Sequence, residues 1–191
     1  MTNIRIKTIA VLIGIMMVTM MGLAGCGTAE ETESSSDLGT EYGSVLGDFQ
    51  VTDIAGVTQN QSLVKDAKFT LVYIWATTCN PCVESLPKME KLYEHYKDLG
   101  INVVGIVVDL QDEQGAVLSS KMQDAKEIAS TQGVTFENLD IPESLLPLLQ
   151  NEIQYTPTGF FVDSAGTVVS DLYVGVYDYD QWSDEIDKLL E

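Results

Sequence analysis

Hydrophobic residues from about residue 45 onward fall into continuous runs and into helically spaced positions. The runs FTLVYIWA (Phe69 to Ala76) and INVVGIVVD (Ile101 to Asp109) are almost entirely apolar, as is typical of strands buried on both faces. Between them, apolar residues recur at helical spacing, and Gly100 follows the last of them: Val83, Leu86, Met89, Leu92, Tyr93, Tyr96 and Leu99. This order predicts two parallel strands joined by a right-handed helical crossover.

The remaining elements have shorter or weaker patterns. We expect a short strand and turn in residues 47–56, and a weak helix or loop in residues 60–68. After the second buried strand we expect a loop over 110–120, a helix over 121–133, a strand over 134–140 and a helical segment over 143–153. Strands over 157–163 and 167–175 flank the turn DSAG, and a helix from about Tyr179 closes the chain.

The N-terminus has the pattern of an export signal. Arg5 and Lys7 precede a long apolar run, and LAGC (Leu23 to Cys26) follows it. LAGC resembles a bacterial lipobox, which implies cleavage before Cys26 and attachment of a diacylglycerol to its thiol. The alternative is an uncleaved transmembrane anchor with a free cysteine, because the run is near the length that spans a bilayer. Both alternatives place the rest of the chain outside the cytoplasm, since the positive residues stay inside.

The segment after the lipobox is almost free of apolar residues. Residues 27–44 consist mainly of Ser, Thr, Gly and Glu, so they cannot bury enough surface to offset the entropy of ordering. We therefore predict a signal peptide over 1–25, the lipidated Cys26 with a disordered acidic and Ser-rich tether over 26–45, and one folded domain over 46–191.

Composition narrows the range of functions. The chain of 191 residues has 29 acidic and 10 basic residues and a net charge of −19. Nucleic acid is not an expected partner, because phosphate contacts require Lys and Arg. The only cysteines are Cys26, Cys79 and Cys82, too few for a scaffold held together by disulfides.

Cys79 and Cys82 lie where the first buried strand gives way to the helix. Unpaired N–H groups and a partial positive charge at a helix N-terminus stabilise a thiolate, and cysteines so placed can have pKa values of about 3.5–7.5. Cys79 is expected to be the more exposed, attacking thiol, with Cys82 one turn further on as the resolving thiol. Pro81 falls in the first turn, where its missing N–H costs little.

The segment WATTCNPCVESLP resembles the thioredoxin superfamily, and most closely its membrane-anchored, extracytoplasmic TlpA/ResA-like branch. Trp75 and Ala76 match the family's WA, residues 79–82 match its C-x-P-C, and Pro87 matches its active-site helix proline. QYTPTGFFVD resembles the family's cis-proline strand, in which Pro157 would face the disulfide and Thr156 would offer backbone groups to a substrate. Gly166 and Gly175 lie where the family has turn and strand glycines.

The resemblance implies an α/β, thioredoxin-like fold with a central mixed β-sheet flanked by helices. It also implies a monomeric thiol–disulfide oxidoreductase that uses the Cys79–Cys82 pair and no other cofactor or metal. Its partners would be thiols and disulfides of exported proteins and a membrane protein that donates or accepts electrons. Some relatives reduce apocytochrome cysteines, so cytochrome c maturation is one possible setting. Trp75, Thr78 and Pro81 would support the cysteines or help to bind substrate.

Two positions depart from the family pattern. Tyr73 occupies the position of the buried Asp of cytoplasmic thioredoxins, and Ser85 the position where the TlpA/ResA branch has Glu. Glu84 is the nearest acidic residue, about 100° around the helix from Ser85, and is a candidate proton relay for Cys82. A solvated acid at a helix N-terminus is an equally good interpretation of Glu84.

Three alternative functions remain open on sequence grounds. A zinc site would need two more ligands, and the chain has one histidine, His95. A thiol peroxidase of the peroxiredoxin type shares this fold, but it normally places Thr and Arg around its cysteine, and the only arginine here is Arg5. A Cu(I)-binding module is compatible with soft thiolates, although the related copper proteins have three residues between their cysteines.

Overall fold

The computed structural model describes residues 35–191. The predicted signal peptide, the lipobox and Cys26 lie outside this part of the chain. Within residues 35–191, no helix is both long enough and apolar enough to cross a bilayer.

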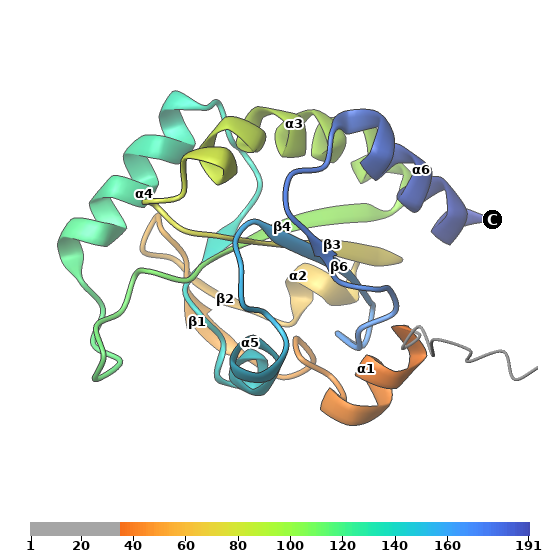
Figure 1. Ribbon diagram of the computed structural model, residues 1–191, viewed down its shortest axis with the longest axis horizontal. Coiled ribbons are helices and arrows are strands. Elements are labelled where there is room, and N and C mark those ends of the chain that lie inside the picture. Colours follow the sequence, from red (N-terminus) through yellow and green to blue (C-terminus); the bar gives the residue numbers. More distant parts are fainter. Residues whose placement is uncertain (1–34) are drawn as a thin grey trace, which may run out of the picture. The chain divides into compact units, whose positions relative to one another are not determined.

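A five-stranded mixed sheet forms the centre of the fold, in the order β5-β4-β3-β6-β7 (Figure 1). β3 (Phe69–Trp75) and β4 (Ile101–Val107) are the two apolar runs, and they pair in parallel as predicted. β6 (Thr158–Asp163) is antiparallel to β3, β5 (Asn138–Leu139) is parallel to β4, and β7 (Tyr173–Val174) is an antiparallel edge strand. The thioredoxin-like mixed sheet expected from the sequence is confirmed.

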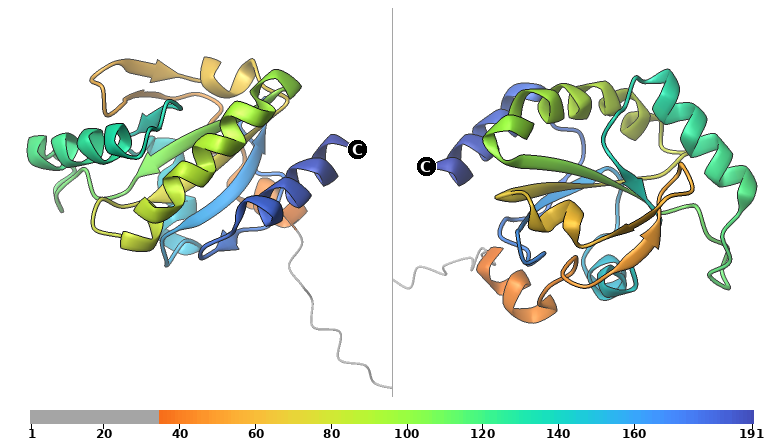
Figure 2. Two further views of the ribbon diagram at one scale, coloured as in Figure 1. Left: turned by 90° about the horizontal axis from the view of Figure 1, so that it is seen from above. Right: turned by 180° about the vertical axis from the view of Figure 1, so that it is seen from behind.

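Helices cover both faces of this sheet (Figures 1 and 2). α3 (Asn80–Tyr96), α4 (Ser119–Thr131) and α6 (Tyr179–Leu190) lie on one face. α1 (Ser35–Tyr42), α2 (Ser62–Lys65) and α5 (Leu146–Asn151) lie on the other. Alternate residues of β3 enter the two cores: Leu71, Tyr73 and Trp75 pack beneath α3, and Val72 and Ile74 face α2 and α5.

Most predicted elements are present, with shifted ends. α3 begins at Asn80 and contains Pro87, and the short 3-10 helix η1 (Lys97–Leu99) leads to Gly100, whose φ of 93° ends the helical segment. The helical segment over 143–153 divides into η2 (Glu143–Leu145) and α5. Of the strand predicted over 167–175, only β7 and an isolated bridge at Val168 pair with β6.

A small antiparallel sheet lies outside the central one. β1 (Gln50–Thr52) was predicted, whereas its partner β2 (Thr58–Asn60) was not. Buried Asp53 shapes the turn between them by accepting hydrogen bonds from the backbone of Ala55 and Val57. Such Asx turns let a short polar segment form a hairpin without an apolar pattern.

The predicted disordered tether is too long. Residues 35–42 form α1, and Val45 and Leu46 are fully buried. The apolar residues Leu38 and Tyr42, four positions apart, pack against the core beneath the sheet, and the Tyr42 hydroxyl donates to Glu152 at 2.7 Å. A tertiary surface thus orders a segment whose own composition could not, and the fold extends to about ten residues before the predicted boundary at 46.

Candidate active site

Cys79 and Cys82 are joined in a disulfide at the N-terminus of α3, with their Cα atoms 5.2 Å apart. Cys79 is the N-cap residue of the helix and is partly exposed, whereas Cys82 is completely buried. This is the arrangement that the sequence predicted. An attacking partner can therefore reach the sulfur of Cys79 but not that of Cys82.

The backbone around Cys79 directs a hydrogen-bond donor at its sulfur. The N–H of Cys82 donates to Cys79 Sγ at 3.3 Å. The N–H of Cys79 donates to Ala76 O at 3.1 Å and closes a tight turn between β3 and α3. A donor at the positive end of a helix favours negative charge on this atom, so the geometry suits a thiolate at Cys79 in the reduced state.

A second chain segment reaches the disulfide from across the sheet. The Thr156–Pro157 peptide bond is cis, and the carbonyl oxygen of Thr156 lies 3.6 Å from Cys79 Sγ. Neighbouring bonds hold this segment: Thr158 Oγ1 donates to Tyr155 O at 2.7 Å, and the N–H of Gly175 donates to Pro157 O at 2.8 Å. Pro157 is buried and Thr156 is half-buried.

Two hydroxyl groups lie beneath Cys82, at the positions where the family has carboxylates. Tyr73 is buried and its hydroxyl donates to Cys82 O at 3.4 Å, while buried Ser85 donates to Pro81 O at 2.9 Å. Burial raises the pKa of Tyr73 to about 12, against a smaller opposing effect of a hydrogen bond with Ser85. Tyr73 is thus a neutral donor at physiological pH and cannot accept a proton from Cys82.

Glu84 is exposed on the outer side of α3. Within the described part of the chain, its side chain makes no hydrogen bond or ion pair with either cysteine. The structure therefore does not bring the candidate proton relay to Cys82.

The supporting residues divide into buried and exposed ones. Trp75 is completely buried, and its indole N–H donates to Asn138 Oδ1 at 2.9 Å, so it supports the site from below. Thr78 and Pro81 are exposed beside the disulfide, where a substrate could contact them. His95 is exposed and bonds to the Tyr179 hydroxyl.

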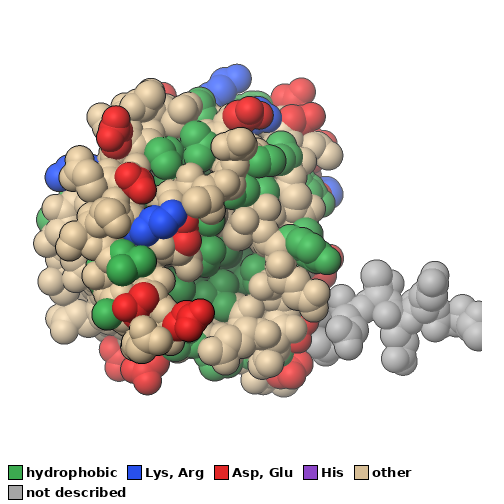
Figure 3. Space-filling view, turned by 60° about the vertical axis from the view of Figure 1, so that its left-hand side comes forward, with side chains coloured by type: hydrophobic (Ala, Val, Ile, Leu, Met, Phe, Trp, Pro, Cys, Tyr) green, Lys and Arg blue, Asp and Glu red, His purple; other side chains and the backbone are tan. Residues whose placement is uncertain are grey.

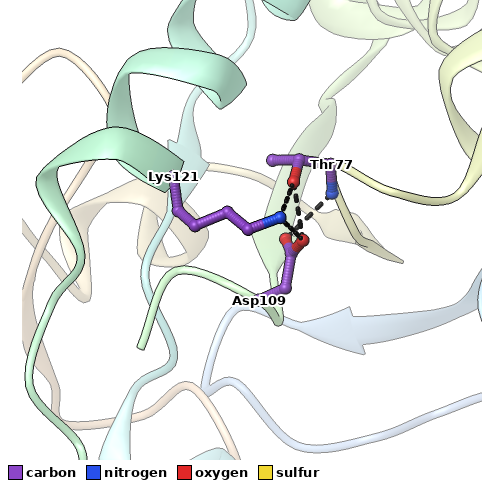
Figure 4. Close-up of polar contacts among 3 residues, drawn as sticks. All are labelled: Thr77, Asp109 and Lys121. Atoms are coloured by element: carbon purple, nitrogen blue, oxygen red, sulfur yellow. Dashed lines mark hydrogen bonds and ion pairs between the residues drawn. The ribbon is translucent and has the colours of Figure 1, made fainter. Parts of the chain in front are cut away.

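A three-residue polar cluster holds the turn that carries Cys79 (Figure 4). Asp109 accepts from the Thr77 N–H at 2.8 Å and from the Thr77 hydroxyl at 2.6 Å. Lys121 reaches from α4 to Asp109 Oδ2 at 3.0 Å and to Thr77 Oγ1 at 2.8 Å. Partial burial opposes ionisation of Asp109, but the bonds from Thr77 and Lys121 outweigh it and lower the pKa of Asp109.

Asp109, Lys121 and Asn138 were not predicted from the sequence. A signal for Asp109 was available, because Asp109 follows a buried strand parallel to the one before Cys79, and the carboxyl ends of parallel strands meet at one edge of a sheet. No pattern in the sequence indicates Lys121 or Asn138, since each is brought to the site by tertiary packing alone.

Two hollows adjoin the segments that meet at the disulfide. One, of about 370 Å³, is lined by polar residues that include Thr77, Thr78, Lys121, Asp124 and Glu127. The other, of about 360 Å³, is mainly apolar and ends at Tyr155 and Thr156. Figure 3 shows a face with hydrophobic side chains in a central hollow and charged side chains around it.

No metal site accompanies the cysteines in the part of the chain that the structure covers, because residues 35–191 contain no group of three or more His, Cys, Asp or Glu side chains able to hold an ion.

Comparisons with known proteins agree with this geometry. A model of the AhpC/TSA family matches residues 42–170. The thioredoxin-like protein YneN of Bacillus subtilis is 28% identical over 179 residues, which cover 92% of this chain and 96% of YneN. The thiol-disulfide oxidoreductase ResA of Bacillus cereus is 30% identical over 132 residues, covering 68% of each chain. A thiol:disulfide interchange protein of Chlorobium tepidum shares the fold, with a TM-score of 0.62, 22% identity, and coverage of 76% of this chain and 94% of that one.

Proposed function

Because the chain belongs to the AhpC/TSA family of thioredoxin-like proteins and is a thiol–disulfide oxidoreductase, we propose that Cys79 and Cys82 are its catalytic pair and that exported proteins are its substrates. One observation carries this proposal. A partly exposed sulfur at a helix N-terminus is bonded to a buried one three residues later.

The reaction proceeds by two exchanges between thiolates and disulfides. The Cys79 thiolate attacks one sulfur of a substrate disulfide, forms a mixed disulfide and releases the other sulfur as a thiolate. Cys82, as a thiolate, then attacks Cys79 Sγ, which forms the intramolecular disulfide and releases the second substrate sulfur. Two electrons pass from the pair to the substrate, and solvent protons neutralise the released thiolates. The reverse sequence oxidises a substrate dithiol.

Thr156 and Pro157 are proposed to position the substrate. The Thr156 carbonyl, 3.6 Å from Cys79 Sγ, lies where the attacking partner must approach. In the reduced protein this carbonyl can also accept a hydrogen bond from a neutral Cys79 thiol. Exposed Thr78 and Pro81 complete the rim that an approaching chain would contact.

The proposed location is the outer surface of the bacterial cell membrane, with Cys26 as the lipidated N-terminus after removal of residues 1–25. α1 begins at Ser35, so eight residues, 27–34, separate Cys26 from the folded part. Eight residues span at most about 28 Å. The disulfide would therefore operate close to the membrane, where a membrane protein could donate or accept its electrons. We expect the chain to act as a monomer. Cytochrome c maturation is one such setting.

The exchange activity is tested on the purified full chain with a peptide that contains one internal disulfide. We expect exchange with the wild type, none with Cys79→Ser, and an accumulated mixed disulfide with Cys82→Ser. Unchanged turnover in Cys79→Ser contradicts the proposal. Peroxide consumption is measured by stopped flow. If the protein consumes peroxide but does not exchange disulfides, it is a thiol peroxidase instead.

Two further measurements address the direction of transfer and the location. The midpoint potential of the Cys79–Cys82 couple against glutathione separates a reductant, at low potential, from an oxidant, at high potential. The mass of the chain from bacterial membranes tests for a diacylglycerol on Cys26. Release of Cys26→Ala from the membrane is expected, provided that the signal is still cleaved.

A further inference from the structure

The Thr77–Asp109–Lys121 cluster joins three elements around the reactive turn (Figure 4). Trp75 and Val107 are partners in the parallel register of β3 and β4, and the N–H of Val108 extends this ladder to Trp75 O at 2.9 Å. Thr77 and Asp109 each lie two residues beyond that pair. The contact between them therefore continues the strand pairing into the turn, with a carboxylate in place of a backbone acceptor.

The hydrogen bonds of Asp109 fix the turn directly. One carboxylate oxygen accepts from the Thr77 backbone, and the other accepts from the Thr77 hydroxyl and from Lys121. Thr77 lies inside the turn that the bond from Cys79 N–H to Ala76 O closes. The two bonds between Thr77 and Asp109 therefore oppose a rotation of this turn that would reorient Cys79.

The same carboxylate places a negative charge against Thr77, two residues before the proposed nucleophile Cys79. Alone, it would oppose the formation of a thiolate. Lys121 neutralises it at 3.0 Å, and the side chains of Lys121 and Asp109 are only 26% and 22% exposed, so solvent screens this pair less than a surface pair. Further acidic side chains lie around the turn: Asp124 and Glu127 on α4 line the same hollow as Thr78, and Glu84 is exposed on the first turns of α3.

Resting on the proposed role of Cys79 as nucleophile, we propose that Asp109 and Lys121 are positioning residues of the reaction. Asp109 holds the turn in the geometry that directs the Cys82 N–H at Cys79 Sγ. Lys121 cancels the charge that this restraint introduces, so that the turn is fixed without disfavouring the thiolate.

The two halves of the pair then have opposite electrostatic effects, and this distinguishes the proposal from a purely structural role. Lys121→Met leaves the carboxylate unpaired and should raise the pH at which Cys79 becomes reactive by about 0.5 unit. Asp109→Asn keeps an Oδ1 that can accept from the Thr77 N–H, so the turn stays restrained. It leaves the ammonium unpaired and should lower that pH by a similar amount. The double variant should return close to the wild-type value, because neither charge remains.

The experiment measures the rate of iodoacetamide alkylation of Cys79 against pH in the reduced full chain at low salt, with the labelled peptide identified by mass spectrometry. Lys121→Arg keeps the charge and should restore the wild-type profile. Lys188→Met is the matched control, since it removes the cation of the Glu185–Lys188 ion pair on α6, on the other side of Figure 1 from α4. It should leave the profile unchanged.

Opposite shifts in the two single variants, with rescue by Lys121→Arg, support the proposal. Shifts of the same sign, or none beyond that of Lys188→Met, overturn it. Should Asp109→Asn fail to fold, the comparison of Lys121→Met with Lys121→Arg decides, because Lys121 is partly exposed and both replacements keep a long side chain. Failure of the proposed function is recognised separately, as wild-type protein that does not exchange disulfides or as Cys79→Ser that still does.

Discussion

The carbonyl oxygen of Thr156 lies 3.6 Å from the sulfur of Cys79, although the two residues are 77 positions apart in the sequence. β6 brings them together, because it pairs with β3 along its length and begins beside the turn that carries Cys79. The sulfur thus lies between a helix N-terminus and an extended segment. Under the proposed mechanism, a substrate bound to Cys79 would therefore contact the Thr156 backbone.

The first prediction concerns the unequal reactivity of the two thiols. In the reduced protein, iodoacetamide at neutral pH should alkylate Cys79 at least about tenfold faster than Cys82, since only Cys79 is exposed and accepts a helix N–H. Peptide mass spectrometry at short reaction times measures both rates. Equal rates, or faster labelling of Cys82, would contradict the assignment of Cys79 as the attacking thiol.

The second prediction concerns the support beneath the site. Asn138→Ala should lower the free energy of unfolding by about 1–3 kcal/mol, because it leaves the buried indole N–H of Trp75 without its acceptor. Urea denaturation followed by circular dichroism measures the loss.

Gly105 provides a double-mutant test of this contact. A Cβ at Gly105 would lie 2.0 Å from Asn138 Oδ1, so Gly105→Ala should itself cost about 1–3 kcal/mol. Removing the Asn138 side chain relieves that clash. The double variant should therefore be more stable than the sum of the two single losses predicts, and strict additivity would show that the two positions do not interact.

The third prediction is a pH dependence at Glu137. Burial, and then the charge and hydrogen bonding of Asp53, raise the pKa of Glu137 in the folded state. Because the pKa of Glu137 is raised in the folded state, ionising this carboxyl group is less favourable in the folded protein than in the unfolded chain. Its contribution to stability is therefore fully present below the unfolded-state pKa, about 4.3, and is lost as the pH rises through the folded-state pKa. Glu137→Gln should therefore be more stable than the wild type at pH 7, and this advantage should disappear below about pH 4. Melting temperatures across this range test it, and an advantage that grows on acidification would refute it.

The fourth prediction tests whether α1 belongs to the fold. Tyr42 packs against the core beneath the sheet and bonds to Glu152, so Tyr42→Ala should cost about 1–2 kcal/mol of unfolding free energy. Its exposed neighbour Glu41 is the control, and Glu41→Ala should stay within about 0.5 kcal/mol of the wild type. If both variants matched the wild type in urea denaturation, the helix would contribute nothing to stability.

Long apolar patterns were reliable guides to the fold, and short polar segments were not. The apolar runs of β3 and β4 and the apolar face of the helix that contains Val83 each bury a large area in any compact fold. Their local sequence pattern therefore decides their secondary structure. β2 and α1 have no such pattern. Each forms because Asp53, or the surface beneath the sheet, satisfies groups that the segment itself cannot.

The amino-acid sequence alone determined the strand–helix unit and the placement of Cys79 and Cys82 at the N-terminus of α3, because residues three apart at a helix start are neighbours in any fold. Only the tertiary structure decided what surrounds them. Thr156, Asp109, Lys121 and Asn138 come from four separate segments. The pairing of β3 with β4 and β6 brings Asp109 and Thr156 to the site, the pairing of β4 with β5 brings Asn138, and helix α4 carries Lys121. Strand pairing joins segments that are far apart in the sequence and buries the whole core together. No local sequence pattern therefore predicts which polar residues the fold brings to the site.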